Sequence, residues 1–164
     1  PNYDAYFGQI ARLLTGDGVA LVHTIGRSDG PGVTGPFVSR HIFPGGYSPA
    51  LSELLPAIER SGLIVTDIEV LRLHYAETLK AWRERFMSRR EEAARILGER
   101  FCRMWEIYLA GSEVAFRYCG LMVFQIQLAK SHNAVPLTRD YIGPREAELR
   151  ARELARSNYR IAAE

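Results

Sequence analysis

Apolar residues recur with helical spacing at the start of the chain and then give way to a short apolar run. Over residues 2–14 they fall three or four positions apart, which predicts an amphipathic helix that ends at the turn 15–18. The run 19–22 is β-branched at both ends and is closed by Gly26, which favours a strand buried on both faces, as in a parallel sheet. Helix, glycine turn and buried strand form half of a βαβ repeat, so the pattern predicts an α/β fold.

The rest of the chain continues this alternation of loops, helices and strands. Residues 26–36 are rich in Gly and Pro and predict a loop, which continues around a Phe-Pro-Gly-Gly turn. Ser48 followed by Pro49 predicts the start of the next helix. The remaining expected elements are a helix over 48–61, a strand over 63–70, at least two helices over 75–118, a strand over 120–130 and an exposed helix over 146–156.

Composition and charge narrow the class of protein. With 164 residues and 47% hydrophobic residues, the chain can form one domain with a core. A net charge of +2 does not suggest binding to nucleic acid. Residues 83–103 hold seven arginines against four glutamates, which is typical of a solvated helix face and leaves a patch for an anionic surface as the alternative. Cys102 and Cys119 lack metal-ligand spacing and are expected to be buried, reduced thiols of a cytosolic protein.

Two residues are candidates for chemistry from their positions alone. His23 stands at the carboxyl end of the first predicted strand, where open α/β sheets bind ligands. Tyr75 follows the second strand and re-enters the same edge of such a sheet. A histidine satisfied within the core and a tyrosine that packs at a helix start are the alternatives. No catalytic triad, carboxylate pair or metal cluster can be assembled from spacing, so the residues alone predict only an α/β domain with a ligand edge.

Several short strings occur in one order along the chain and together resemble a known family. They are Pro1 to Phe7 leading to Leu-Val-His-Thr-Ile-Gly at 21–26, Ile-Phe-Pro-Gly-Gly at 42–46, His-Tyr-Ala-Glu-Thr-Leu-Lys-Ala-Trp at 74–82, Glu-Arg-Phe at 99–101 and Phe-Arg at 116–117. This combination resembles the cyclopropane-fatty-acyl-phospholipid synthases and mycolic acid cyclopropane synthases. The match covers roughly residues 1–130 and leaves the tail uncovered.

The resemblance implies a fold, a cofactor and a reaction. Such enzymes have a seven-strand, Rossmann-like fold and use S-adenosylmethionine to add a methylene or methyl carbon to the cis double bond of a phospholipid acyl chain. In the family a glutamate, a histidine and a tyrosine hold a bicarbonate that accepts a proton. By motif, the histidine and tyrosine are His23 and Tyr75, and Phe43 and Leu79 would line the acyl tunnel. The implied setting is cytoplasmic and peripheral to the inner face of the membrane, where the unsaturated acyl chains lie.

The departures from the family pattern are equally informative. Nothing in this chain matches the family's S-adenosylmethionine loop, and the bicarbonate-binding glutamate belongs to a motif that lies before the Pro-Asn-Tyr string. Residues 1–130 are therefore expected to be the C-terminal half of the methyltransferase domain, containing strands five to seven and inserted helices, with 131–164 as a peripheral tail. The chain begins with Pro1, not Met, which indicates a processed, cleaved or incomplete piece.

Such a piece has consequences for activity and assembly. Alone it is expected to be inactive, with the cofactor bound by the absent half. The first strand would have an open edge, so we expect a homodimer or a complementing chain. A non-catalytic acyl-binding, membrane-binding or assembly module derived from the same fold is the alternative.

Overall fold

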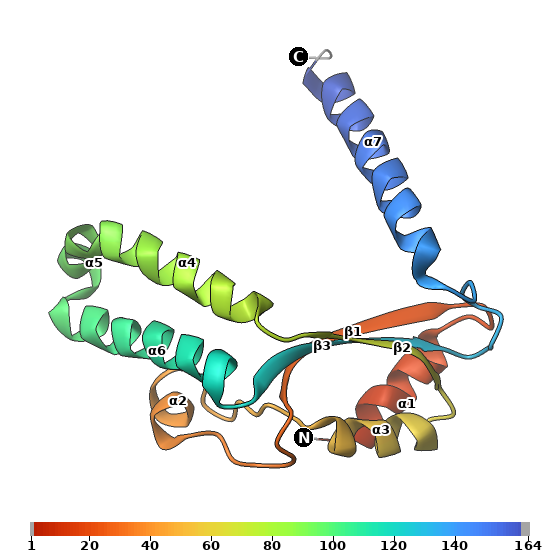
Figure 1. Cartoon of the computed structure of the whole chain (residues 1–164), viewed down its shortest axis with the longest axis horizontal. Helices are drawn as coiled ribbons and strands as arrows, with labels where there is room; N and C mark the ends of the chain where they lie inside the picture. The colour runs from red at the N-terminus through yellow and green to blue at the C-terminus, as the bar shows by residue number, and fades with distance from the viewer. Residues whose placement is uncertain (1, 162–164) are drawn as a thin grey trace. The chain divides into compact units, whose positions relative to one another are not determined.

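The structure of the chain, a computed structural model, describes residues 2–161, with side chains through residue 154. The chain divides into two compact units, residues 1–132 and 133–164. Figure 1 labels the elements. In the first unit they are α1 (Tyr3–Leu13), β1 (Val19–Arg27), α2 (Pro36–His41), α3 (Leu51–Arg60), β2 (Ile64–Leu71), α4 (His74–Ser88), α5 (Arg90–Leu97), α6 (Glu99–Tyr118) and β3 (Leu121–Ala129).

The three strands form one sheet in the order β1-β3-β2 (Figure 1). β3 lies in the centre and pairs antiparallel with both neighbours, so β1 and β2 run parallel without pairing with each other. At the outer edge of β1, the Arg27 N–H donates to the Pro49 carbonyl (3.0 Å), forming an isolated bridge between Arg27 and Ala50. Among the described strands β1 pairs only with β3 and therefore lies at one edge of this sheet.

One face of the sheet packs against α1 and α3 (Figure 1). Phe124, Ile126 and Leu128 of β3 are buried here, together with Phe7 of α1 and Ile58 of α3. The two-residue period of a strand places all three β3 residues on this face. This cluster is the larger apolar core of the unit.

Within the first unit, the opposite face of the sheet is covered at one end by α4 and α6. Val123 of β3 packs with Leu79 of α4 and Leu109 of α6, while Ile25 and Leu71 join from the outer strands. Figure 1 shows α4, α5 and α6 as a helical hairpin that extends away from this end of the sheet. The rest of the face carries partly buried and exposed side chains of β1 and β2.

A charged network joins the two long helices of this hairpin. Glu113 of α6 accepts hydrogen bonds from Arg83 of α4 (3.1 Å) and Arg117 (3.0 Å), and Arg117 also reaches Glu77 of α4 (2.8 Å). Burial opposes ionisation of Glu113, but the hydrogen bonds and charges of the two arginines outweigh it and lower the pKa of the carboxyl. The network therefore fixes α4, whose first turn carries Tyr75.

The second unit contains the 3-10 turn Arg139–Tyr141 and α7 (Ile142–Ile161). Ion pairs along the helix surface join Arg145 to Glu148, Arg150 to Glu146 and Arg152 to Glu148. Such exposed pairs stabilise a helix by only about 0.2–0.5 kcal/mol each. The exposed helix expected over 146–156 is therefore present and longer than predicted.

Three expectations are wrong in detail. β1 is not buried on both faces, because alternate residues such as Val19 and Leu21 are exposed, and β3, its partner among the described strands, runs antiparallel to it. α3 does not begin at Ser48: Ala50 is its N-cap, and the Glu53 carboxylate accepts from the Ala50 N–H (2.8 Å). Cys102 is buried as expected, but Cys119 is exposed.

Candidate functional site

The Phe-Pro-Gly-Gly segment is a tight turn that presents Phe43. The Gly46 N–H donates to the Phe43 carbonyl (2.9 Å), and Gly45 has a φ of 76°. Proline at the second position and a positive φ at the third define a type II turn, which favours glycine. The Thr34 hydroxyl donates to the Gly46 carbonyl (2.6 Å) and holds the turn against the preceding loop.

A cavity of about 500 Å³ brings together three of the four predicted site residues. His23 of β1, Phe43 of the turn and Tyr75 of α4 all line it, although they are far apart along the chain. Thr24, Tyr47 and other residues of β1 and the loop complete the wall. We call this cavity the His23 pocket.

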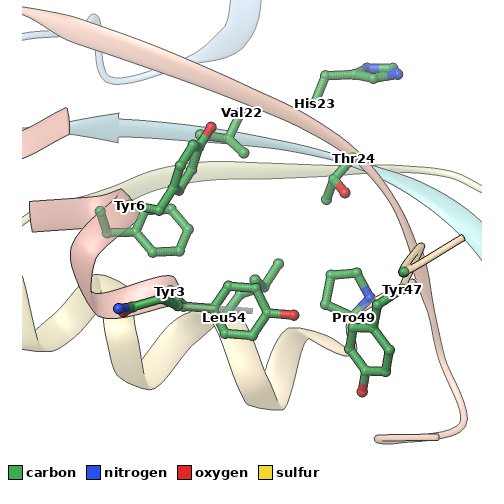
Figure 2. A pocket seen from close by; sticks show the side chains of 11 residues that line it. Tyr3, Tyr6, Val22, His23, Thr24, Tyr47, Pro49 and Leu54 are labelled. Atoms are coloured by element: carbon green, nitrogen blue, oxygen red, sulfur yellow. The ribbon is translucent and has the colours of Figure 1, made fainter. Parts of the chain in front are cut away.

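The His23 side chain lies on the exposed part of the sheet face that α4 and α6 partly cover. Its Nδ1 atom lies 3.3 Å from Nε2 of Gln125, its register partner on β3. Figure 2 shows the imidazole pointing to the opposite side of β1 from Thr24 and Leu54. This agrees with the alternation of side chains along a strand. His23 is thus accessible to a ligand and is not a buried core histidine.

Phe43 and Tyr75, which line the His23 pocket, pack against further aromatic rings behind its wall. The Tyr75 ring lies 5.0 Å from the Phe116 ring and 5.9 Å from the Trp82 ring, measured between centroids. Phe43, which is 53% exposed, meets Tyr108 edge to face at 5.9 Å. Burial, together with the nearby Tyr75, raises the pKa of Tyr108, so its hydroxyl stays neutral. This wall suits an apolar ligand, and ring faces attract positive charge.

Leu79 occupies a different environment from the other three predicted residues. It is 0% exposed and packs with Ala76, Leu109 and Val123 in the core beneath Tyr75. It is not among the residues that line the His23 pocket. Its role in lining an acyl tunnel stays a prediction.

A second cavity, of about 570 Å³, borders the same stretch of β1 and is called the Tyr3 pocket. Figure 2 shows Tyr3 of α1, Thr24 of β1 and Leu54 of α3 around it, with Tyr47 between the loop and α3. The buried Tyr3 hydroxyl has no hydrogen-bond partner among the described residues. Burial, followed by the charges of Glu53 and Tyr47, raises the pKa of Tyr3.

The structure also identifies a pair that sequence reasoning missed. The Tyr47 hydroxyl donates to the Glu53 carboxylate, with distances of 2.7 and 2.8 Å to its two oxygens. This hydrogen bond first, and burial second, raises the pKa of Tyr47. Because Tyr47 lines both pockets, the pair fixes the wall between them. The only signal in the sequence was a glutamate three residues into a helix, which is typical of a capping box.

One glycine pattern was also missed in the sequence. Gly30, Gly32 and Gly35 have the G-x-G-x-x-G spacing between β1 and α2. The spacing is typical of dinucleotide-binding loops that open directly from a strand into a long helix. Here α2 has six residues, and a Cβ at Gly32 would lie 1.8 Å from Nη1 of Arg27, so the guanidinium occupies the inside of the loop. This loop does not fit a nucleotide phosphate.

The two cofactors implied by the family differ in how they fit. For S-adenosylmethionine, neither pocket is lined by a glycine-rich strand-to-helix loop of the kind the family uses. A small anion such as bicarbonate fits the side chains better, because the His23 imidazole and the Tyr75 hydroxyl are hydrogen-bond donors on one cavity. Among the described residues no group of three or more His, Cys, Asp or Glu forms a metal site.

Across residues 2–161, every helix is too short or too polar to cross a bilayer.

Comparison with known proteins gives consistent matches. Residues 1–126 match the family model described as mycolic acid cyclopropane synthetase. A probable fatty acid methyltransferase of Pseudomonas putida is 38% identical over 132 residues, which is 78% of this chain and 33% of that protein. The cyclopropane-fatty-acyl-phospholipid synthase of Escherichia coli K12 is 33% identical over 129 residues, which is 79% of this chain and 34% of that protein. The chain thus spans about a third of the length of these relatives.

Solved structures support the same fold. The cyclopropane synthase MmaA2 of Mycobacterium tuberculosis superimposes with a TM-score of 0.72 at 30% identity, covering 78% of this chain and 50% of that one. The mycolic acid cyclopropane synthase CmaA1, in complex with SAH and CTAB, gives 0.69 at 29% identity, covering 77% of this chain and 49% of that one. These matches confirm the predicted class, a partial α/β, Rossmann-like methyltransferase fold.

Proposed function

Because the chain belongs to the mycolic acid cyclopropane synthetase family, we propose that it forms the acyl-acceptor side of a lipid methyltransferase. The reaction adds a methylene or methyl carbon to the cis double bond of a phospholipid acyl chain. The observation that carries the proposal is the convergence of His23, Phe43 and Tyr75 on one cavity. The family resemblance identified these three residues in separate segments of the chain, and all three line this cavity.

The side chains of this cavity suit the chemistry of an alkene that gains a carbon. S-adenosylmethionine supplies an electrophilic methyl group when it is bound. The alkene then develops positive charge, which the rings of Phe43 and Tyr75 stabilise through their electron-rich faces. His23 and Tyr75 would donate hydrogen bonds to a bound bicarbonate, which would serve as the proton acceptor.

The methyl donor is proposed to bind in the part of the family fold outside these residues. Support comes from the comparisons, in which the chain covers 50% of MmaA2 and 49% of CmaA1, the second of which is complexed with SAH. Titration of the isolated 164-residue chain with S-adenosylmethionine should therefore give no measurable binding heat. Tight binding would contradict this division of labour.

The partner and the cellular setting follow from the same proposal. The unpaired edge of β1 favours a complementing chain or a homodimer, because an open strand edge presents free N–H and C=O groups. Acyl chains of phospholipids lie in membranes, so we place the protein in the cytoplasm, peripheral to the inner face of the membrane.

The decisive test is lipid analysis in cells. The chain would be co-expressed with the remainder of the methyltransferase in a host that makes monounsaturated phospholipids, and mass spectrometry would seek acyl chains heavier by one CH₂ group. His23→Ala and Tyr75→Phe should abolish this gain. The matched controls His132→Ala and Tyr118→Phe, at exposed positions that do not line the His23 pocket, should retain it.

The same experiment separates the alternative function. A chain that binds acyl lipid but yields no modified product, even beside the complete cofactor half, would be a non-catalytic binding module. Loss of product in His132→Ala as well as in His23→Ala would indicate a folding defect and would remove the support for a catalytic His23.

A further inference from the structure

Gln125 faces His23 across the sheet, and its carboxamide lies within hydrogen-bond distance of the imidazole ring. The two residues are register partners on β3 and β1, and the carboxamide Nε2 lies 3.3 Å from the imidazole Nδ1. Gln125 is partly buried on the central strand, between the buried residues Phe124 and Ile126, which anchor the backbone on the opposite face. The backbone from which its side chain extends is thus held at a fixed place opposite His23.

The chemistry of the two nitrogens fixes the direction of this hydrogen bond. A carboxamide nitrogen carries two hydrogens and no lone pair that accepts, so it can only donate. Nδ1 of His23 must then accept, and in the neutral ring the proton resides on Nε2. The remaining ring N–H is therefore the one that faces away from Gln125.

We propose that Gln125 is a positioning residue that selects the Nε2–H tautomer of His23. In this form the imidazole offers an N–H donor to an anion in the His23 pocket, as holding bicarbonate requires. The opposite tautomer would present a lone pair at Nε2, which repels an anion. That this N–H donor binds bicarbonate rests on the proposed function, whereas the tautomer itself can be measured on this chain alone.

Gln127 provides a matched comparison on the same strand and the same face of the sheet. Its carboxamide oxygen accepts from the Thr66 hydroxyl of the β2 segment (2.9 Å), and its register partner on β1 is Leu21, which has no polar side chain. Gln127 therefore resembles Gln125 in type and placement, but its register partner on β1 is not a histidine. Substitution at Gln127 controls for general effects of removing a glutamine from β3.

Nuclear magnetic resonance of the ring nitrogens tests the proposal on the 164-residue chain. Long-range ¹⁵N–¹H correlation distinguishes a protonated ring nitrogen from one with a lone pair, and the His23→Asn spectrum assigns the His23 signals. At about pH 9, where an imidazole is neutral, Nε2 should be the protonated nitrogen. In Gln125→Met, the ratio of the Nε2–H tautomer to the Nδ1–H tautomer should fall roughly fivefold, which corresponds to the usual net free energy of one hydrogen bond.

A second variant reverses the expected sign. In Gln125→Glu the carboxylate accepts only, so Nδ1–H should become the favoured tautomer. Gln127→Met should leave the His23 signals in place. Predominance of Nδ1–H in the unmodified chain would overturn the proposal, because the carboxamide would then present its oxygen to the ring. Equal tautomer ratios in Gln125→Met and the unmodified chain would overturn it as well.

The NMR test of the tautomer and the lipid test of the proposed function can contradict their proposals independently of each other. A chain with the Nε2–H tautomer whose complemented enzyme makes no modified lipid would refute the methyltransferase proposal and leave the role of Gln125 intact. An active enzyme in which His23 carries its proton on Nδ1 would refute the role of Gln125 alone.

Discussion

The two faces of the sheet differ in how completely helices cover them. The face under α1 and α3 is closed by apolar side chains, and Phe124 at its centre is 1% exposed. The other face is covered by α4 and α6 only at one end, and further along β1 it carries His23 and then Leu21, which is 61% exposed. The candidate site lies where the helical cover ends. Stability and chemistry are thus assigned to opposite sides of the same three strands.

The largest expected effect is on the free energy of unfolding, from a substitution in the closed face of the sheet, the one under α1 and α3. Phe124→Ala should lower the free energy of unfolding by about 3–5 kcal/mol, because it removes a buried ring and leaves a cavity. Leu21→Ala, on the open face of the neighbouring strand, should change it by no more than about 0.5 kcal/mol. Urea unfolding followed by circular dichroism measures both. Equal losses in the two variants would mean that the open face is covered in solution.

A smaller effect is expected at Gly26, where β1 crosses the closed face. A Cβ at this position would lie 2.3 Å from the Phe124 ring and 2.6 Å from the Pro49 carbonyl oxygen. Gly26→Ala should therefore destabilise the chain by about 1–3 kcal/mol through overpacking. Gly8→Ala provides the control, since a Cβ there meets nothing within 4 Å and α1 gains helix propensity. The two glycine substitutions should shift the urea midpoint in opposite directions.

The smallest effect concerns the loop between the two pockets and appears only in alkali. The hydrogen bond to Glu53 raises the pKa of Tyr47 above that of an unfolded tyrosine, about 10. The folded chain then holds the proton more tightly, so this stability is complete below about pH 10 and is lost as pH rises through the folded pKa. In Tyr47→Phe, the free energy of unfolding should fall less steeply with pH. Parallel pH profiles would show that the pair contributes nothing.

Much of the first unit can be predicted from local patterns. The helix at the N-terminus and the strand near residues 63–70 follow directly from apolar spacing and glycine stops. The pairing of the strands cannot be predicted in this way, because β1 pairs with β3, about 100 residues further along. An apolar run of four residues does not reveal whether its partner is parallel or antiparallel. The exposure of Val19 and Leu21 follows from tertiary cover, which the local pattern does not encode.

The residues of the candidate site, like the elements of the fold, could be predicted only in part from the sequence. His23 and Tyr75 can be singled out from their positions in the sequence, although β1 continues to Arg27 and places His23 in mid-strand and not at the carboxyl end. Phe43 required the family resemblance, and the structure brings the three to one cavity. Gln125, Thr24 and Tyr47 were missed because a polar residue in a strand or loop usually faces water. Their significance depends on which residue lies opposite, and that is a property of register.

The central place of β3 also determines when the sheet can form. β3 is the last strand along the chain, and neither β1 nor β2 has another strand partner in the sheet. At a synthesis rate of about 5–20 residues per second, roughly 5–20 s separate the appearance of β1 from that of β3. During this interval only local helices such as the α4–α6 hairpin can mature. A chain whose synthesis stops before Leu121 would therefore carry β1 and β2 without the strand that joins them, so completion of β3 is the step that assembles this part of the sheet.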